Sequence, residues 1–362
     1  MGKSRCFCRP PRSAGRDGPD MPGKAVPYAC WNTTLRCNLR CRWCYALKRG
    51  REPGLDRQLA VADGIARHCE RVSLMGGEPL TNPHIAELAR RLYGRCGISL
   101  VTNGVLLTPA VIGQFAPLLD RLSVSVDAVE QGVATACRGP GYDVSRVTEG
   151  VRAAVRAGIP LKVNTLLSSL NRGHLPRIGR FLESLGCPVD WKLFEPAETE
   201  FSDREAVLSV RLPRAEFEDT AGAMASRFTG LSVRTALCDD ITDYVLITPD
   251  GGMYTSSING STPLGNVADG DDPAEFLARW GWSREANAEL FAGKAGRRAD
   301  HGDEGRGGAQ GPAHQDGHVG RQAPEDRGHV RRDAGGRLVA PEHGLLRLQE
   351  RGAGVLQAQG LT

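Results

Sequence analysis

The sequence lacks the features of a membrane or secreted protein. No apolar run reaches the roughly 18 residues needed to span a bilayer, and the N-terminus has basic residues without the apolar segment of a secretory signal. Eleven cysteines, an odd number in a long chain, do not resemble a secreted disulfide framework. We therefore expect a cytoplasmic protein without membrane association.

The sequence also lacks an excess of charge of either sign. It has 46 basic and 42 acidic residues, a net charge of +4. This balance does not favour nucleic-acid binding, so no nucleic-acid partner is expected. Partners must be inferred from a site rather than from composition.

Two end segments lack the apolar periodicity of a folded core. Residues 1–24 carry Pro, Gly, Arg and Ser, which predicts a disordered leader. Residues 293–362 contain no Phe, Trp, Tyr, Ile, Met, Cys, Ser or Asn, and such a low-complexity tail cannot bury a core. Two interpretations stay open for it: a natural disordered tail, or a GC-rich coding region read out of frame.

Between these ends, short apolar runs alternate with stretches of helical period. The pattern predicts strands near 27–34, 71–75, 98–102, 121–126, 161–166 and 189–194, separated by helices near 57–68, 83–93, 109–119, 144–157 and 175–185. Six strands separated by helices predict a parallel sheet, and apolar strands such as 161–166 predict burial on both faces. We predict an α/β fold in which residues 25–195 form a partial (β/α)6 TIM-type barrel.

Residues 196–292 are predicted to form a C-terminal α+β cap. One helix is expected over 212–228, followed by strands over 231–235 and 243–248. Pro249 to Gly252 then form a tight turn. This cap would lie across the open side of the barrel.

Three cysteines follow the first predicted strand with the spacing CxxxCxxC: Cys37, Cys41 and Cys44. Three thiolates can hold three irons of a cubane iron–sulfur cluster, and no further cysteine occurs before Cys69, so the fourth iron stays open for another ligand. The alternatives are a zinc site with a distant fourth ligand and a non-catalytic electron-transfer protein.

Four short motifs follow these cysteines in order: Met75-Gly76-Gly77-Glu78-Pro79, Val101-Thr102-Asn103-Gly104, Ser123-Val124-Ser125-Val126-Asp127 and Lys162-Val163-Asn164-Thr165. With the cysteines, they resemble the radical S-adenosylmethionine (radical SAM) superfamily over residues 27–195. The resemblance implies a 4Fe–4S cluster on the three cysteines and S-adenosylmethionine on its open iron. Reductive cleavage would yield a 5′-deoxyadenosyl radical that abstracts hydrogen from a substrate, with electrons from an external low-potential donor of flavodoxin or ferredoxin type.

The same resemblance implies which residues contact S-adenosylmethionine. Gly76 and Gly77 lack a Cβ and would let backbone carbonyls approach the methionine ammonium, with Glu78 as a charged acceptor. The full implied set is Trp43, Gly76, Gly77, Glu78, Asn103, Ser125, Asp127, Arg138 and Asn164. Taken singly, the short polar members are as typical of turns and caps.

Two lysines lie inside apolar strands, Lys162 and Lys192. A buried ammonium is costly unless it is paired, so an anionic substrate between the strands would account for both. The alternative is a pair of structural bridges to carboxylates, with Asp190 and Glu195 as candidates.

Within the superfamily, the pattern is most similar to viperin-like single-cluster members. Matching stretches are Cys137-Arg138-Gly139-Pro140-Gly141, Trp191-Lys192-Leu193-Phe194 and Asp243-Tyr244-Val245-Leu246-Ile247. Members with auxiliary clusters carry cysteine-rich extensions, whereas Cys238 alone follows the predicted barrel here.

The viperin-like resemblance implies dehydration of a nucleoside triphosphate. Lys162 and Lys192 would bind the triphosphate, and Tyr244 would return a hydrogen atom to the product radical. Radical modification of a peptide or of a sugar-containing metabolite is the alternative.

Overall fold

The computed structural model describes residues 24–41, 43–44, 46, 49–199, 201–238, 244–257, 260–277, 282–292, 331–332 and 338–339. The chain divides into two units, residues 1–300 and 301–362. The described part of the second unit is one antiparallel pair, β11 (Arg331–Arg332) with β12 (Leu338–Val339). Apart from Lys24 and this pair, the predicted leader and tail lie outside the described residues.

The first unit is built on a sheet in which β8-β1-β2-β3-β4-β5-β6-β7 are parallel neighbours. Their bounds are β1 (Val26–Asn32), β2 (Cys69–Met75), β3 (Gly97–Thr102), β4 (Arg121–Ser125), β5 (Leu161–Leu166), β6 (Val189–Phe194), β7 (Ser232–Ala236) and β8 (Tyr244–Ile247). The six strands predicted for the barrel are confirmed as β1 to β6. Two strands from the segment predicted as a cap, β7 and β8, extend the same sheet at opposite edges. The antiparallel strands β9 (Gly252–Ser257) and β10 (Gly260–Asn266) continue it beyond β8.

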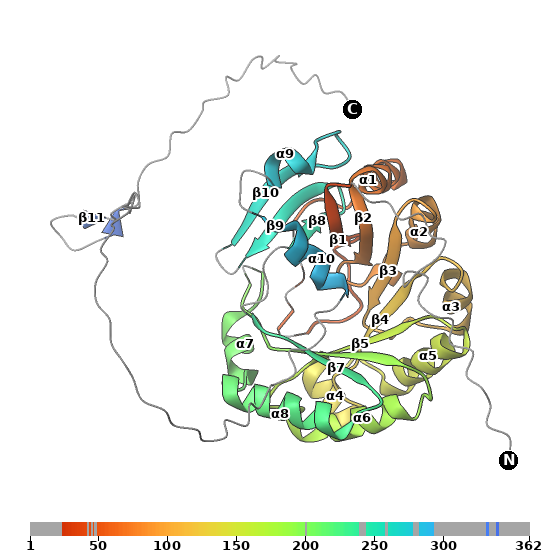
Figure 1. The fold of residues 1–362 in the computed structure, drawn as a ribbon, viewed down its shortest axis with the longest axis vertical. Coiled ribbons are helices and arrows are strands. Elements are labelled where there is room, and N and C mark those ends of the chain that lie inside the picture. The colour runs from red at the N-terminus through yellow and green to blue at the C-terminus, as the bar shows by residue number, and fades with distance from the viewer. Residues whose placement is uncertain are drawn as a thin grey trace, which may run out of the picture. The chain divides into compact units, whose positions relative to one another are not determined.

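Helices surround the outer face of this curved sheet (Figure 1). The helices of the described chain are α1 (Leu55–His68), α2 (Ile85–Leu92), α3 (Pro109–Phe115), α4 (Gln131–Arg138), α5 (Val144–Arg156), α6 (Leu175–Glu183), α7 (Arg204–Val210), α8 (Arg214–Arg227), α9 (Pro273–Leu277) and α10 (Arg284–Ala292). In Figure 1, α10 lies inside the ring of strands, where Asn287 bonds the Tyr28 backbone of β1. Side-chain caps begin several of them: Thr108 accepts from the Val111 amide ahead of α3, and Asp143 accepts from the Arg146 amide at α5. The predicted helices are confirmed, whereas α4, α7, α9 and α10 were not predicted.

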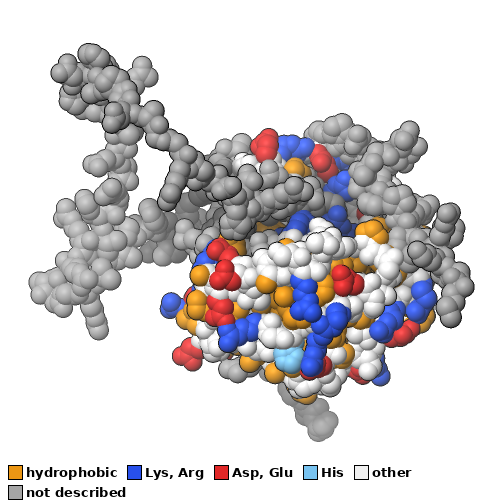
Figure 2. Space-filling view, turned by 60° about the horizontal axis from the view of Figure 1, so that its bottom comes forward, with side chains coloured by type: hydrophobic (Ala, Val, Ile, Leu, Met, Phe, Trp, Pro, Cys, Tyr) orange, Lys and Arg blue, Asp and Glu red, His pale blue; other side chains and the backbone are white. Residues whose placement is uncertain are grey.

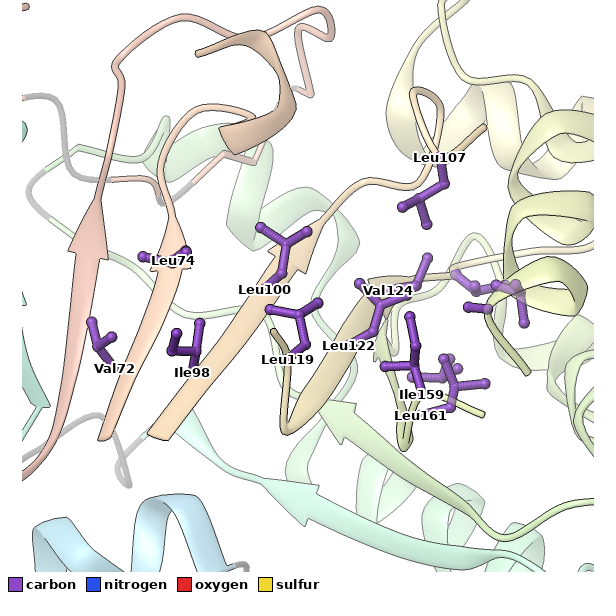
Figure 3. Packing of buried hydrophobic residues seen from close by; sticks show 14 of the residues in the cluster. Val72, Leu74, Ile98, Leu100, Leu107, Leu119, Leu122, Val124, Ile159 and Leu161 are labelled. Carbon is purple, nitrogen blue, oxygen red and sulfur yellow. The ribbon is translucent and has the colours of Figure 1, made fainter. Parts of the chain in front are cut away.

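The core lies between the outer face of the sheet and the helices. Every second residue of neighbouring strands enters it, as Figure 3 shows for Val72, Leu74, Ile98, Leu100, Leu122, Val124 and Leu161. Burying one such side chain stabilises the fold by about 1.5–3 kcal/mol. The amphipathic face of α2 supplies Ile85, Leu88 and Leu92 from the other side.

The inner face of the sheet is polar. On β5, Leu161, Val163 and Thr165 are buried, while Lys162 and Asn164 between them face inward and are partly exposed. The expectation that residues 161–166 are buried on both faces is therefore wrong, because the inward-facing residues are only half-buried. The strand alternates because its outer face packs on helices and its inner face does not.

The sheet curls so that the inner faces of distant strands approach one another. Burial raises the pKa of Cys30 on β1 to about 11, and the ammonium groups of Lys162 and Lys192, on β5 and β6, act against that rise. In a flat sheet, β1 and β5 would lie about 19 Å apart, because neighbouring strands are about 4.8 Å apart. The α/β class and the partial TIM-type barrel are thus confirmed (Figure 1).

Within the described ranges, no helix combines the length and apolar character needed to cross a bilayer. Figure 2 shows basic and acidic side chains interspersed on one face, so that face carries no field of a single sign.

Candidate active site at the carboxyl ends of the strands

The polar motifs of the sequence meet where strands β1 to β4 end. We call this region the rim and define it as residues 33–41, 76–82, 102–105 and 125–141. Carboxyl ends of parallel strands lie at one edge of a sheet, so motifs far apart in sequence come together there.

The cysteine loop follows β1 in the rim. Cys37 is exposed, Cys41 and Cys44 are half-buried, and all three are free thiols. The Cys44 amide donates to the Cys41 carbonyl over 3.3 Å, and the Cys41 thiol donates to the Arg138 carbonyl over 3.6 Å. Burial raises the pKa of Cys37, and the nearby Cys41 and Cys44 raise it further, so the three thiols are neighbours.

The donor set fits the cluster that its spacing implies. In the described ranges, no three His, Cys, Asp or Glu side chains already converge tightly enough to hold a metal ion. Three free thiols on one loop are nevertheless the ligands that a cubane cluster takes, with one iron left for another ligand. The assignment of Cys37, Cys41 and Cys44 as metal ligands stays a prediction.

The glycine pair packs against the chain that leads into the cysteine loop. The Gly77 amide donates to the Thr34 carbonyl over 2.9 Å, and the Glu78 amide to the Arg36 carbonyl over 2.8 Å. A Cβ at Gly76 would collide with the Thr34 carbonyl, and one at Gly77 with the Arg36 carbonyl. The sequence argument assigned the missing Cβ atoms to a bound methionine. In the structure, the close approach that requires glycine is to the chain's own backbone.

Glu78 ties the end of β2 to the end of β3. Its side chain is 1% exposed. One carboxylate oxygen accepts from the Thr102 hydroxyl over 2.7 Å and the Leu80 amide over 3.2 Å, and the other from the Asn103 amide over 2.7 Å. Burial raises the pKa of Glu78 to about 7, although these donors act in the opposite direction. The carboxylate thus organises the rim, and its predicted contact to S-adenosylmethionine stays a prediction.

Asn103 links the end of β3 to the cysteine loop. Its side-chain amide donates to the Asn38 side chain over 2.8 Å, and its carbonyl oxygen accepts from the Val105 amide over 3.0 Å. On the far side of the loop, the Glu52 carboxylate accepts from the Thr34 hydroxyl over 2.8 Å and from the Leu35 amide. The loop is therefore held at both of its sides.

Asp127 and Arg138 form a buried ion pair behind the cysteine loop. The Asp127 carboxylate is fully buried and accepts from Arg138 Nε over 2.5 Å and from the Leu166 amide over 2.8 Å. Burial lowers the pKa of Arg138, but the attraction of Asp127 outweighs that effect and raises it. Gly139, with φ of +90°, ends α4 immediately after this arginine. Asp127 therefore orients Arg138.

Ser125 and Asn164 are register partners at the ends of β4 and β5. The Ser125 carbonyl accepts from the Tyr142 hydroxyl over 2.9 Å. Among the described residues, the side-chain oxygens of Asn164 and Asn32 are buried without a hydrogen-bond partner. Buried acceptors are normally satisfied, so these two are suited to donors on a ligand.

Trp43 lies in a small separate core. It is 6% exposed and packs with Cys137, Val207 and Val210 from α4 and α7. The contacts that the structure gives Trp43 are thus protein side chains, and its predicted contact to the adenine stays a prediction.

The structure does not bring Tyr244 to the rim. Tyr244 is the first residue of β8, and the next residue, Val245, pairs with Ala29 in β1. Tyr244 also lies close enough to Tyr28 to contribute to the raised pKa of that phenol, whose main cause is burial. Tyr244 is therefore in the amino-terminal half of the strands, and its predicted hydrogen-atom role stays a prediction.

The two strand lysines face inward near one ring. The Lys192 ammonium lies 5.0 Å from the centre of the Phe194 ring, and that of Lys162 lies 6.0 Å from it. Burial lowers the pKa of Lys162 to about 7, and the positive charge of Lys192 lowers it further. Both lysines are thus placed on the inner face, as the proposed anion contact requires.

The carboxylates suggested as their structural partners bind arginines. Asp190 is held by Arg234 at two points, one of them Nε to Oδ1 over 2.8 Å. Glu195 accepts from Arg214 over 3.1 Å and from the Cys238 amide over 2.9 Å.

Sequence reasoning missed two inward arginines, Arg121 on β4 and Arg234 on β7. Both contribute to the lowered pKa of Lys162. We call Arg121, Lys162, Lys192 and Arg234 the basic cluster. In the sequence, each of these two arginines is a basic residue on one face of a strand. The pattern of a single strand does not tell whether that face points inward or to the surface.

Comparison with known families decides the class. Residues 31–182 match the model of the radical SAM superfamily, and this match contains the cysteine loop and the rim. The chain carries a radical SAM domain. The predicted cofactors, a 4Fe–4S cluster and S-adenosylmethionine, are those of this superfamily.

Relatives of the radical SAM domain include nucleotide and heme enzymes. A probable GTP 3′,8-cyclase of Methanopyrus kandleri is 32% identical over 173 residues, 46% of this chain and 56% of that protein. An AdoMet-dependent heme synthase of Methanosarcina barkeri is 30% identical over 165 residues, 43% of this chain and 47% of that protein. The chain spans about half the length of the curated relatives that it matches. These names do not confirm the viperin-like pattern.

Solved structures share the fold of the radical SAM domain. Streptococcus suis SuiB bound to the precursor peptide SuiA has a TM-score of 0.58 at 13% identity, covering 74% of this chain and 67% of that one. The structure of anSMEcpe with bound AdoMet and a peptide has a TM-score of 0.56 at 14% identity. The match covers 72% of this chain and 84% of that one.

Proposed function

We propose that this chain is a radical SAM enzyme that reductively cleaves S-adenosylmethionine and acts on an anionic substrate, a nucleoside triphosphate. The observation that carries the proposal is the rim. There the cysteine loop, the Gly76-Gly77 turn and the Asp127–Arg138 pair meet at one edge of the sheet.

Residues in and beside the rim have separate tasks in this proposal. Cys37, Cys41 and Cys44 would hold a cluster whose bound form supplies the electron that breaks a sulfonium carbon–sulfur bond. Asp127 holds Arg138 in place, and a guanidinium so fixed suits a carboxylate. The carbonyl oxygens of Asn32 and Asn164 offer acceptors to hydroxyl or amino groups. An external low-potential protein of flavodoxin or ferredoxin type would deliver electrons.

Two observations support a nucleotide substrate. The first is the inward basic cluster, which a phosphorylated ligand would neutralise. The second is that several relatives are named GTP 3′,8-cyclases. Two reactions on such a substrate are considered. One is cyclisation, as in the names of those relatives, and the other is viperin-like dehydration. A peptide or a sugar-containing metabolite is the alternative substrate.

The test is anaerobic reconstitution with iron and sulfide, followed by reduction with S-adenosylmethionine and a substrate panel. We expect 5′-deoxyadenosine to rise with a nucleoside triphosphate and not with the corresponding nucleoside, and mass spectrometry then distinguishes a cyclised from a dehydrated product. Cys41→Ala is the negative control. Substrate-dependent 5′-deoxyadenosine with a peptide instead would overturn the nucleotide assignment. No cleavage in any reconstituted sample would overturn the radical SAM activity.

A further inference from the structure

The loop that carries the three cysteines has charge of a single sign. Residues 35–51 contain six basic residues and no acidic one. The whole chain has 46 basic and 42 acidic residues, so without this loop the acidic residues would outnumber the basic ones by 42 to 40. The net positive charge of the chain therefore comes from the loop that holds the predicted cluster ligands.

Three described residues of this loop are exposed arginines: Arg36, Arg40 and Arg51. We call them the loop arginines. Arg36 and Arg40 lie on either side of Cys37 in the chain, and Cys37 is exposed, whereas the other two cysteines of the motif are half-buried. Of the three predicted cluster ligands, Cys37 is therefore the one that a molecule in solution can approach.

The loop folds back so that its end lies beside its beginning. Glu52, which follows Arg51, accepts from the Thr34 hydroxyl over 2.8 Å and from the Leu35 amide. Because Leu35 precedes Arg36, these bonds bring the backbone at Arg51 close to the backbone at Arg36. All three loop arginines therefore belong to the surface around the exposed cysteine.

The loop arginines have no carboxylate partner among the described residues. Exposed arginines on the helices commonly have one: Arg156 pairs with Glu149, and Arg204 pairs with Glu198. Glu52 is the acid closest to the loop in sequence, and its bonds go to the start of the loop rather than to an arginine side chain. The loop thus presents positive charge that a partner from outside can meet.

These charges suit a partner that stays outside the barrel. Lys162 and Lys192, which the proposed function assigns to the substrate, lie on the inner side of the sheet beside Phe194, whereas the loop arginines are exposed to solvent. An electron for the predicted cluster must also arrive from outside. A positive surface speeds the encounter with a negatively charged protein and orients it.

We propose that the loop arginines form the docking surface for the electron donor, an acidic low-potential protein of flavodoxin or ferredoxin type whose carboxylates meet them around Cys37. One electron passes from the reduced donor to the oxidised cluster, and the donor leaves in its oxidised form. This inference rests on the proposed function, because a donor is needed only if the three cysteines hold a cluster.

The first test measures binding, without turnover. Calorimetric titration of the reconstituted full chain with an oxidised acidic flavodoxin should show binding at low ionic strength that weakens as salt is added, because exposed charges are screened. Arg51→Glu should weaken this binding about three- to tenfold. Arg156→Glu is the matched control and should change it less than about twofold. Both substitutions change the net charge equally, but Arg156 ends α5 shortly before β5 begins, at the end of the strands opposite the rim.

The second test separates docking from the chemistry at the cluster. Reduced methyl viologen is a small cation that needs no docking surface, so the parent and Arg51→Glu should form 5′-deoxyadenosine at similar rates with it. With reduced flavodoxin at low salt, the variant should be about three- to tenfold slower than the parent, and Arg156→Glu should match the parent.

Three results would overturn the inference: flavodoxin affinity of the parent that does not change with salt, equal affinity in Arg51→Glu and Arg156→Glu, and a rate in Arg51→Glu that falls as much with methyl viologen as with flavodoxin. The last result would mean that Arg51 acts on the cluster or the substrate. If the parent cleaved S-adenosylmethionine with neither reductant, the proposed activity would fall, and the titration would still decide whether the loop arginines bind the donor.

Discussion

The rim, at the ends of strands β1 to β4, and the basic cluster, on the inner face of β4 to β7, treat buried charge differently. In the rim, the carboxylates of Glu78 and Asp127 each have donors from neighbouring loops. In the basic cluster, the ammonium of Lys162 has no such partner within the described residues. The comparison teaches that the chain itself satisfies the buried carboxylates of the rim, whereas the proposed function assigns the compensation of Lys162 to a ligand.

The largest expected effect is the loss of iron when a cysteine of the loop is replaced, a change that should leave the basic cluster intact. Cys41→Ala should lower the iron content after anaerobic reconstitution from about four per chain to near zero, since a cubane cluster needs three thiolates. Triphosphate binding should survive, because Cys41 is not among the residues proposed to bind the phosphates. The measurement is iron and labile sulfide per chain, with Cys187→Ala as a control that retains both. One zinc per chain without sulfide in the parent would contradict the assignment.

A second change tests whether the rim depends on its internal ion pair. Asp127→Ala leaves Arg138 without its partner in a buried site and should lower the free energy of unfolding by about 3–5 kcal/mol. Urea unfolding measures this loss. Glu149→Ala breaks an exposed pair with Arg156 and should change the same free energy by at most about 1 kcal/mol. Similar losses in both variants would mean that the buried Asp127–Arg138 pair stabilises the fold no more than an exposed ion pair does.

A third change sharpens the contrast, because removing a cluster charge should stabilise the ligand-free protein. The pKa of Lys162 is about 7 in the folded state, below its usual 10.5. The folded state therefore disfavours the charged form, and this penalty grows as pH falls from 10.5 to about 7 and persists below. Lys162→Met should raise the free energy of unfolding at pH 7 by about 1–3 kcal/mol and weaken triphosphate binding. A loss of stability would identify Lys162 as a structural partner instead.

The smallest expected effect is a dependence of anion binding on pH. Lys162 carries its charge below a pKa of about 7, set by burial and by repulsion from Lys192, Arg121 and Arg234 against attraction from Asp190. Affinity for triphosphate should therefore fall about three- to tenfold between pH 6.5 and 8.5. The ionisation of triphosphate itself also changes its affinity with pH, and Lys162→Met measures that contribution alone. The affinity of this variant should therefore change less with pH than that of the parent. The same slope in parent and variant would exclude Lys162 as its source.

Much of this organisation could be read from periodicity alone. The strands β1 to β6 were predictable because each carries a short apolar run flanked by turns, and the helices between them carry a repeat of 3.6 residues. The inner face was harder to predict. Residues 161–166 were expected to be buried on both faces, yet Lys162 and Asn164 lie on a half-buried face opposite Leu161 and Val163.

The partners within the site could not be predicted. Arg138 binds Asp127 because α4 brings it back over the strand end, and α4 was not predicted. Arg234 meets Asp190 because β7 pairs with β6 across a connection that contains two helices. Such pairings depend on non-local register, which no local pattern encodes.

The sequence by itself determined the class of this protein, because the CxxxCxxC spacing and the order of the motifs after it can be read without the fold. It also determined the outer face of the sheet, since burial against helices demands apolar residues at every second position. Only the tertiary structure decided which charges are satisfied and which are left for a ligand. Curling the sheet sets Lys162 among cations from other strands, and only the folded distances decide which charges pair.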